Sequence, residues 1–184
     1  MTTTEVLNRR FVKPEIVSTH FHLRPGDKVA DFGAGSGYFV RPLSKLVGSE
    51  GRVYACEIQR SLVETIADIV RQESTQNVEV IWCDFETEGG TKIDDGALDA
   101  GVVVNTLFQI GNKSAAIKEF VRTLRPGGKL FIVDWMESWG GLGPQPEDVV
   151  NDKEAVALCE SGGLVFERDF DAGDHHYGLA FRKP

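Results

Sequence analysis

The chain has 184 residues and a formal net charge of −8, with apolar and charged fractions that are ordinary for a globular protein. Its length fits one domain with one sizeable core, and its acidity argues against a nucleic-acid backbone as the main partner, since that affinity depends on clustered Lys and Arg. No apolar run approaches the ~20 residues of a membrane-spanning helix, and the best stretch, 98–111, is interrupted by Asp99 and Asn105.

The N-terminal segment and the cysteines indicate in which cellular compartment we expect the protein. The segment MTTTEVLNRR lacks the apolar core of a signal peptide. Cys56, Cys83 and Cys159 are widely spaced, and no C-x-x-C pair indicates a metal or redox site. We therefore expect a cytoplasmic, reduced protein with no metal and no membrane association.

The first elements follow a strand–loop–helix pattern. A helix is expected to begin at Pro14, a favoured first-turn residue, and to end before the RPGDK turn. The run 28–32, KVADF, predicts a strand, and the glycine-rich loop GAGSG at 33–37 follows it directly. The run 38–48 then predicts a helix, and 52–57, RVYACE, a second strand.

The middle of the chain repeats this alternation. A helix is expected over 61–73, with Ser61 as its N-cap and Glu64 completing a capping box. Strands are predicted at 78–84 and 98–105, and a helix at 113–124.

The last third predicts a strand at 129–135, a Gly- and Pro-rich loop at 136–148 and a helix at 147–163. The runs 164–172 and 175–183 are joined too tightly for a parallel crossover, so they predict an antiparallel hairpin. This order is typical of an α/β protein with a mostly parallel sheet.

Polar residues end five consecutive predicted strands. They are Asp31, Glu57, Asp84, Asn105 and Asp134, the last followed by Trp135. Ligands of such sheets bind beyond the carboxyl ends of the strands. Although any one of these residues could be a solvated strand end, their joint occurrence predicts a binding site along this edge.

The residues at this edge favour a ligand that contains adenosine. Glu57 is suitably placed to accept hydrogen bonds from both hydroxyls of a ribose, and Asp84 from an exocyclic amine. Ile58, Trp82 or Phe85 could contact the base. Gly33, Gly35 and Gly37, with Ala34, leave room where a ligand crosses the loop and where the next helix packs.

The loop does not match a dinucleotide or a phosphate site. Tyr38 and Val40 stand where the dinucleotide fingerprint needs a small third residue, and the Lys-Ser/Thr pair of a P-loop is missing. Asp31 would repel a pyrophosphate and attract a cationic group. A ligand with adenosine at one end and positive charge at the other fits these residues better.

The motifs VADFGAGSG, VYACEI, VIWCDFE, LDAGVVVN and LRPGGKLFIVDW, in this order between Pro25 and Trp135, resemble those of class I S-adenosylmethionine-dependent methyltransferases. The pattern is most similar to small methyltransferases of the ubiquinone/menaquinone-biosynthesis type. The resemblance implies a three-layer αβα Rossmann-like fold, with a seven-stranded sheet of order 3-2-1-4-5-7-6. It implies one domain over 1–184, made of an N-terminal helical segment covering the site (1–24), a cofactor-binding core (25–135) and a terminal part (136–184).

By the same resemblance the glycine loop passes under the methionine part of S-adenosylmethionine. Asp31 would hold the ammonium group, Glu57 the ribose and Asp84 the adenine amine. Asn105 and Thr106 would lie near the sulfonium.

The acceptor is expected to be a small molecule, methylated by in-line displacement. Asn105 is followed by Thr-Leu-Phe, which departs from the Asn-Pro-Pro-aromatic pattern of methyltransferases that modify nucleobase or glutamine amino groups. A general base is needed only for an acceptor that starts protonated. Asp134 and His20 are the candidates for a catalytic role, whereas His175 and His176 are expected in the hairpin turn, away from the chemistry.

Two other functions stay open at this point. One is a non-catalytic S-adenosylmethionine-binding module or partner subunit, because no clear base is present. The other is a nicotinamide-dependent oxidoreductase, which ranks below because Tyr38 and Val40 break its fingerprint. The acceptor, the atom methylated and the oligomeric state do not follow from these motifs.

Overall fold

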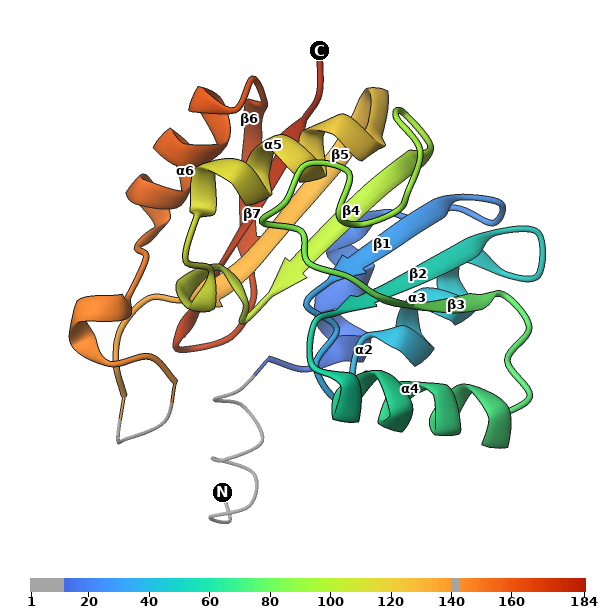
Figure 1. The fold of residues 1–184 in the computed structure, drawn as a ribbon. Helices are drawn as coiled ribbons and strands as arrows, with labels where there is room; N and C mark the ends of the chain where they lie inside the picture. The colour runs from blue at the N-terminus through green and yellow to red at the C-terminus, as the bar shows by residue number, and fades with distance from the viewer. Residues whose placement is uncertain (1–11, 140–142) are drawn as a thin grey trace.

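A computed structural model describes residues 12–139 and 143–184. Seven strands form one sheet in the order β3-β2-β1-β4-β5-β7-β6, so the expected strand order is confirmed (Figure 1). The first five pair in parallel, while β7 runs antiparallel to both β5 and β6. The strands are β1 (Lys28–Phe32), β2 (Arg52–Glu57), β3 (Val78–Trp82), β4 (Leu98–Val104), β5 (Leu124–Trp135), β6 (Val165–Asp171) and β7 (His176–Arg182).

Helices cover both faces of this sheet. On one face lie α2 with η1, α3 and α4, and on the other α5 and α6 (Figure 1). Their bounds are α2 (Pro14–Val17), η1 (Ser18–Phe21), α3 (Val40–Val47), α4 (Arg60–Gln72), η2 (Leu107–Gln109), α5 (Lys113–Thr123), η3 (Pro146–Asp148) and α6 (Asp152–Ser161). The fold is therefore the expected three-layer, Rossmann-like one. No described helix is long and apolar enough to cross a membrane.

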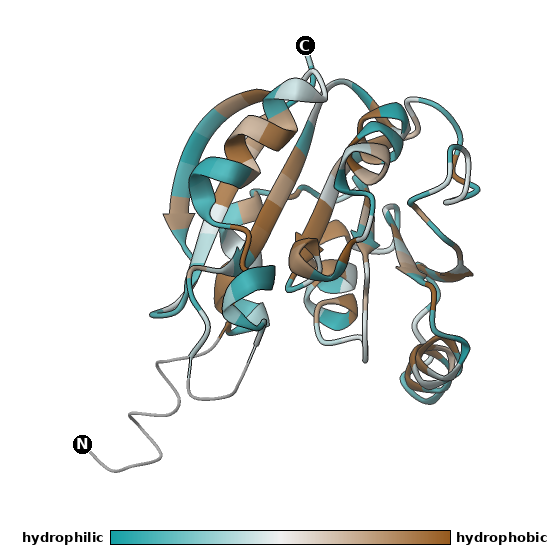
Figure 2. Ribbon diagram, turned by 60° about the vertical axis from the view of Figure 1, so that its left-hand side comes forward, coloured by the Kyte–Doolittle hydropathy of each residue, from teal (hydrophilic) through white to brown (hydrophobic). Residues whose placement is uncertain are grey.

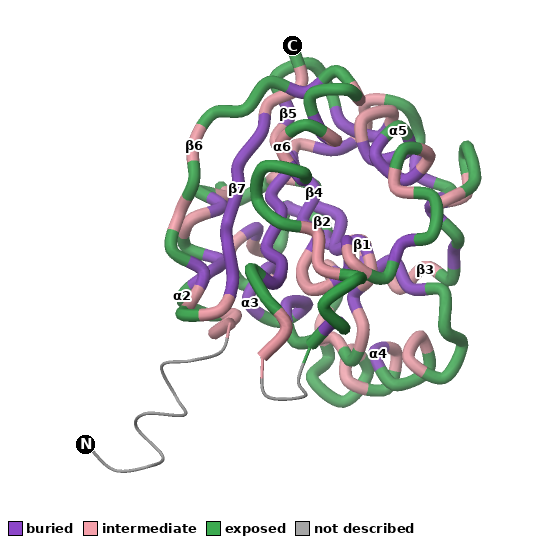
Figure 3. Tube along the Cα trace, turned by 90° about the vertical axis from the view of Figure 1, so that its left-hand side faces the viewer, coloured by how far each residue is buried: buried purple, intermediate pink, exposed green. Residues whose placement is uncertain are grey.

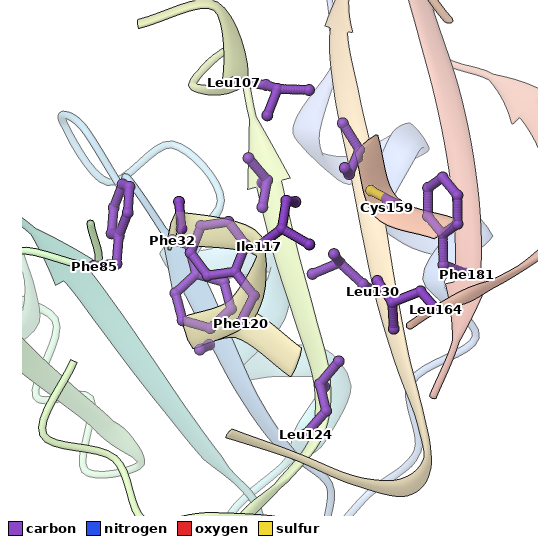
Figure 4. Packing of buried hydrophobic residues seen from close by; sticks show 14 of the residues in the cluster. Phe32, Phe85, Leu107, Ile117, Phe120, Leu124, Leu130, Cys159, Leu164 and Phe181 are labelled. Atoms are coloured by element: carbon purple, nitrogen blue, oxygen red, sulfur yellow. The ribbon is translucent and has the colours of Figure 1, made fainter. Parts of the chain in front are cut away.

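Each face has its own apolar cluster. Under α3 and α4 the cluster includes Leu43 and Ile66. The central strands are mostly hydrophobic, whereas the helices combine hydrophobic and hydrophilic residues (Figure 2). On the opposite face Phe32 of β1 stacks on Phe120 of α5, with ring centroids 4.2 Å apart, and Phe85 packs beside both rings (Figure 4).

Burial is greatest in the middle of the sheet. The first six residues of β7 are buried because this strand lies between β5 and β6, whereas most of edge strand β6 is exposed (Figure 3). The hairpin thus extends the parallel sheet and shields its edge.

Several predicted boundaries were wrong. Strand β3 ends two residues early, at Trp82, and β4 one residue early, at Val104. Strand β5 already begins at Leu124, which pairs with Leu98, and the RPGG segment forms an irregularity before Lys129 pairs with Ala100. The predicted helix 113–124 therefore ends at Thr123.

The predicted capping box at Ser61 was also wrong. Helix α4 begins at Arg60, and its N-cap position, Gln59, makes no side-chain cap hydrogen bond. The Glu57 carboxylate accepts the backbone N–H of Gln59, which starts the helix before Ser61. A capping box does form at α6, between Asn151 and Glu154, and so this helix begins at Asp152 rather than near 147.

Candidate cofactor site

A cavity of about 670 Å³ lies at the carboxyl ends of the parallel strands. Nine of the ten residues predicted to bind the cofactor line its wall: Asp31, Gly33, Ala34, Gly35, Glu57, Ile58, Asp84, Phe85 and Asn105. The structure therefore brings residues separated by up to 74 positions, from 31 to 105, around one space. Tyr38 is part of this wall and is 77% exposed.

The glycine loop comes close to its neighbours at Gly33. A Cβ on Gly33 would lie 2.5 Å from the Thr106 side chain, and its φ of +81° is one that residues with side chains rarely adopt. The Gly33 and Ala34 N–H groups both donate to the Cys56 carbonyl, which fixes the loop against the end of β2. Any other residue at this first position of the loop would have to displace the Thr106 side chain and adopt a strained backbone conformation.

Gly37 is the predicted residue that does not line the cavity. A Cβ there would lie 3.3 Å from the Ile66 side chain of α4, so this glycine allows the loop to pack against the helix. Its role is in packing rather than in contact with a ligand.

Glu57 is a buried carboxylate that the surrounding backbone holds in place. Its Oε1 accepts the N–H groups of Ile58 at 2.9 Å and Gln59 at 2.8 Å, and its Oε2 accepts the Gly35 N–H at 2.9 Å. Since a carboxylate offers about four lone-pair positions, one remains on Oε2 for a ligand hydroxyl. The ribose hydroxyls that Glu57 is predicted to bind would therefore meet Oε2 first, because Oε1 already accepts two backbone N–H groups.

Asp31 is buried and makes no side-chain hydrogen bond to another described residue. Burial, with a further contribution from the Glu57 carboxylate, raises the pKa of Asp31 to about 7. A cationic group in the cavity would favour the ionised form and reverse this shift. Asp31 is therefore suited to hold a positive charge.

Asp84 and Glu86 complete the acidic part of the wall. Asp84 is exposed. Its Oδ1 accepts the Glu86 N–H at 2.9 Å and its Oδ2 accepts the Thr87 hydroxyl at 3.5 Å, which leaves Oδ2 able to accept one further donor. Glu86, which the motifs did not single out, accepts the N–H groups of Gly111 and Asn112 and so ties the end of β3 to the loop before α5.

The turn after β4 carries a buried, unpaired side-chain oxygen. Asn105 has a φ of +52°, and its buried Oδ1 has no hydrogen-bond partner among the described residues. Thr106 Oγ1 donates to the Val104 and Gly33 carbonyls, which joins this turn to the glycine loop.

Asp134 lies behind this turn rather than on the cavity wall. Its Oδ2 accepts the Leu107 N–H and its Oδ1 the Trp135 N–H, each at 2.8 Å. Burial raises the pKa of Asp134 to about 6, and these backbone N–H donors oppose the shift. Its position makes it a residue that holds the β4–η2 turn rather than one that faces an acceptor.

The other candidate for catalysis, His20, also lies outside the wall of the cavity. Its ring stacks on Phe170 with centroids 5.2 Å apart, and its carbonyl accepts from Arg168.

Trp82, considered as a contact for the adenine base, is not part of the cavity wall either. Arg60 covers its ring at 3.9 Å, and its Nε1 donates to the Ile58 carbonyl.

The expectation that both histidines of the hairpin lie away from the site was wrong for His176. His176 is the first residue of β7 and pairs with Trp135, the last residue of β5, and both line the cavity. An antiparallel strand begins at the edge where its parallel neighbours end, a signal that the sequence already contained. His175 instead contacts Glu137 and stacks on Trp139.

The charge of the cavity wall indicates which ligands it can bind. Four carboxylates line it, from Asp31, Glu57, Asp84 and Glu86, and no Lys or Arg does so among the described residues. Such a site disfavours phosphates and attracts a cation. S-adenosylmethionine fits these four carboxylates. Its sulfonium and ammonium groups are positively charged, and its ribose hydroxyls and adenine amine are hydrogen-bond donors.

The comparisons with known proteins agree with this chemistry. A family model described as a methyltransferase domain matches residues 29–128. The crystal structure of an S-adenosylmethionine-dependent methyltransferase from Aquifex aeolicus is 28% identical, with a TM-score of 0.87, over 95% of this chain and 91% of that one.

Two curated relatives bear the name ubiquinone/menaquinone biosynthesis C-methyltransferase UbiE. The one from Chromobacterium violaceum is 34% identical over 122 residues, 66% of this chain and 48% of the relative. The one from Laribacter hongkongensis is 32% identical over 150 residues, 82% of this chain and 58% of the relative. The chain thus spans about half the length of these relatives.

The family model covers more than half of the chain, the sheet has the strand order that the motifs implied, and the acidic cavity lies where the cofactor is expected. This chain belongs to the class I S-adenosylmethionine-dependent methyltransferases.

Proposed function

We propose that the chain transfers the methyl group of S-adenosylmethionine to a small, uncharged acceptor. The observation that carries the proposal is the acidic cavity, in which the buried Asp31 carboxyl has no partner among the described side chains. A cationic ligand would stabilise the ionised form of such a buried, unpaired carboxyl. The same acidity disfavours a nucleic acid or another polyanion as the acceptor.

The cofactor would be held by groups from three strand ends and the loop. Asp31 would bind the ammonium, Glu57 Oε2 a ribose hydroxyl and Asp84 Oδ2 the adenine amine. The glycine loop, from Gly33 through Ala34 to Gly35, would let the methionine part approach the backbone.

Three further residues would complete this site. Ile58, which is 52% exposed, and Phe85 would give the adenine apolar contacts. Asn105 would lie near the centre of the edge, between the cofactor and the acceptor.

When bound, S-adenosylmethionine supplies a methyl group that is already activated by the positive sulfur. The chain then has to bind and orient the acceptor and to exclude water. That the two curated relatives are C-methyltransferases supports a carbon atom of a small molecule as the methylated atom. The three buried, free cysteines support the expected cytoplasmic location.

Calorimetry followed by product identification tests the proposal. We expect S-adenosylmethionine and S-adenosylhomocysteine to bind in the micromolar range. Incubation with methyl-labelled cofactor and a metabolite extract should then give a labelled small product, which a Glu57→Ala variant fails to make. Absence of binding heat with both ligands would reject the proposal, and binding without any labelled product would favour a non-catalytic module.

A further inference from the structure

Ile58 is a half-exposed apolar residue on the cavity wall. It follows Glu57 directly, at the end of β2. Under the proposed function its side chain contacts the adenine, and the ligand then covers apolar area that is otherwise exposed. Because ordering a mobile side chain costs free energy on binding, the strength of this contact depends on how firmly Ile58 is held beforehand.

The peptide groups on both sides of Ile58 are held by hydrogen bonds. Its N–H donates to Glu57 Oε1 at 2.9 Å, and its carbonyl accepts the Trp82 Nε1–H at 2.8 Å. The first partner is the preceding residue, whereas the second comes from the neighbouring strand β3, 24 residues away in the chain. Trp82 thus fixes the backbone of a wall residue without itself belonging to the wall.

The surroundings of Trp82 keep its indole N–H aimed at Ile58. Trp82 is the last residue of β3 and pairs with Glu57 of β2. Arg60 lies over its ring at 3.9 Å from the centroid, and Lys92 Nζ lies 5.3 Å from the centroid and donates to the Trp82 carbonyl at 2.9 Å. Since 43% of Trp82 is exposed, these contacts, rather than burial in the core, set its orientation.

The indole N–H is the part of Trp82 that Ile58 uses. Indole nitrogen is a donor only, and a ring without it would leave the Ile58 carbonyl to pair with water. Water would satisfy the carbonyl at this half-exposed place but would not tie it to β3. Loss of the N–H should therefore loosen the Ile58 peptide more than it destabilises the fold.

We infer that Trp82 is a positioning residue for the cofactor, whose indole N–H holds the Ile58 peptide and thereby places the Ile58 side chain against the base. The inference rests on the proposed function, because it takes adenosine as the group that Ile58 contacts. It requires that Trp82 contributes to cofactor affinity only while the Ile58 side chain is present.

A double-mutant cycle with S-adenosylhomocysteine tests this requirement. Trp82→Phe keeps an aromatic ring beside Arg60 but removes the N–H. We expect it to raise the Kd in calorimetry about threefold to tenfold, the range that one neutral hydrogen bond contributes. Ile58→Ala removes the contact with the base and should also raise the Kd. The double variant should have the Kd of Ile58→Ala alone, because the indole N–H then has no side chain to place.

A matched control comes from the same strand. Tyr54→Phe removes a side-chain donor from β2 at a residue that does not line the cavity, and it should keep the wild-type Kd. Thermal unfolding of each ligand-free variant shows whether it folds. Trp82→Tyr, which also lacks the indole N–H, replaces Trp82→Phe in the cycle if that variant does not fold.

The cycle separates this inference from the proposed function. If the wild type does not bind S-adenosylhomocysteine, the proposed function itself fails. If the wild type binds it, either of two results overturns the inference: a wild-type Kd for Trp82→Phe, or the same fold-loss from Trp82→Phe with and without the Ile58 side chain. The second result would mean that Trp82 supports the cavity in general, for example through Glu57, rather than through Ile58.

Discussion

Glu57 and Gly35 are joined by a hydrogen bond, in which Glu57 Oε2 accepts the Gly35 N–H at 2.9 Å although 22 residues separate the two. The bond connects the end of β2 to the glycine loop after β1. The same oxygen is the one that keeps a free lone pair for a ligand. Loop position and ligand binding therefore depend on one carboxylate.

Glu57→Gln should weaken S-adenosylmethionine binding. A Gln side chain that keeps its oxygen toward Ile58 and Gln59 presents an NH₂ group to the Gly35 N–H, where two donors face each other. In the complex the same NH₂ group replaces the free lone pair that a ribose hydroxyl needs. Losing a hydrogen bond to a charged group costs about 1.5–3 kcal/mol, so we expect the Kd in calorimetry to rise by about 10- to 100-fold. Glu64→Gln, on the exposed face of α4, is the control and should leave the Kd unchanged. Equal affinities for Glu57→Gln and the wild type would contradict this role.

Asp31→Asn should stabilise the ligand-free protein above neutral pH. The pKa of Asp31 is about 7 in the folded chain and 3.8 ordinarily, so the folded state holds its proton more tightly. Stability from this proton is present at low pH and is lost as the pH rises from about 4 to about 7. At pH 8 the variant should gain about 1–4 kcal/mol, with a Tm higher by ~2–4 °C per kcal/mol.

The same variant should lose affinity for the cofactor, since it lacks the charge that attracts the ammonium. In the wild type, binding at pH 7 should release protons, because a cation lowers the raised pKa of Asp31. Calorimetry in buffers with different ionisation enthalpies measures this release. A lower Tm of Asp31→Asn at pH 8, or binding without proton release, would show that Asp31 is not the charged partner.

The fold was predictable because its signals are local and repeated. Strands β1 and β2 have the predicted bounds, since Lys28–Phe32 and Arg52–Glu57 are apolar runs that end at turn residues. Sheet order followed from the resemblance, which rests on ordered motifs. The errors came where tertiary contacts override local preference. Glu57 starts α4 before Ser61, and pairing with β4 begins β5 at Leu124.

The cavity wall was predictable where a strand end carries a polar residue, as at Asp31, Glu57 and Asn105. It was missed where the wall comes from a strand start or a connecting loop. His176 is the first residue of its strand, and Glu86 lies two residues after Asp84, bound to backbone that is 25 or 26 residues away. The place of His176 follows from the antiparallel hairpin once the sheet order is known, whereas the contacts of Glu86 depend on the folded chain and leave no periodic signal in the sequence.

Gly33→Ala should abolish cofactor binding and destabilise the fold. The new Cβ would lie 2.5 Å from the Thr106 side chain, in a conformation with φ of +81°. Gly163→Ala is the matched control, with φ of +93° and no atom within 4 Å of its Cβ. The control should lose only the ~1–2 kcal/mol of a left-handed residue and keep binding. Similar losses of stability and of binding in both variants would show that Thr106 gives way and that the contact does not restrict the loop.

Asn151→Ala should destabilise the protein, whereas Ser61→Ala should not. Asn151 Oδ1 accepts the Glu154 N–H at 3.0 Å, and the Glu154 carboxylate accepts the Asn151 N–H at 3.1 Å in return. Losing this cap costs about 1 kcal/mol, which lowers the Tm by ~2–4 °C for a chain of this size. Ser61 lies inside the first turn of α4, where Ala is the better helix former, so its replacement should leave the Tm unchanged or slightly higher. Thermal unfolding of both variants by circular dichroism measures the difference, and a Ser61→Ala loss as large as that of Asn151→Ala would mean that α4 begins at Ser61 in solution.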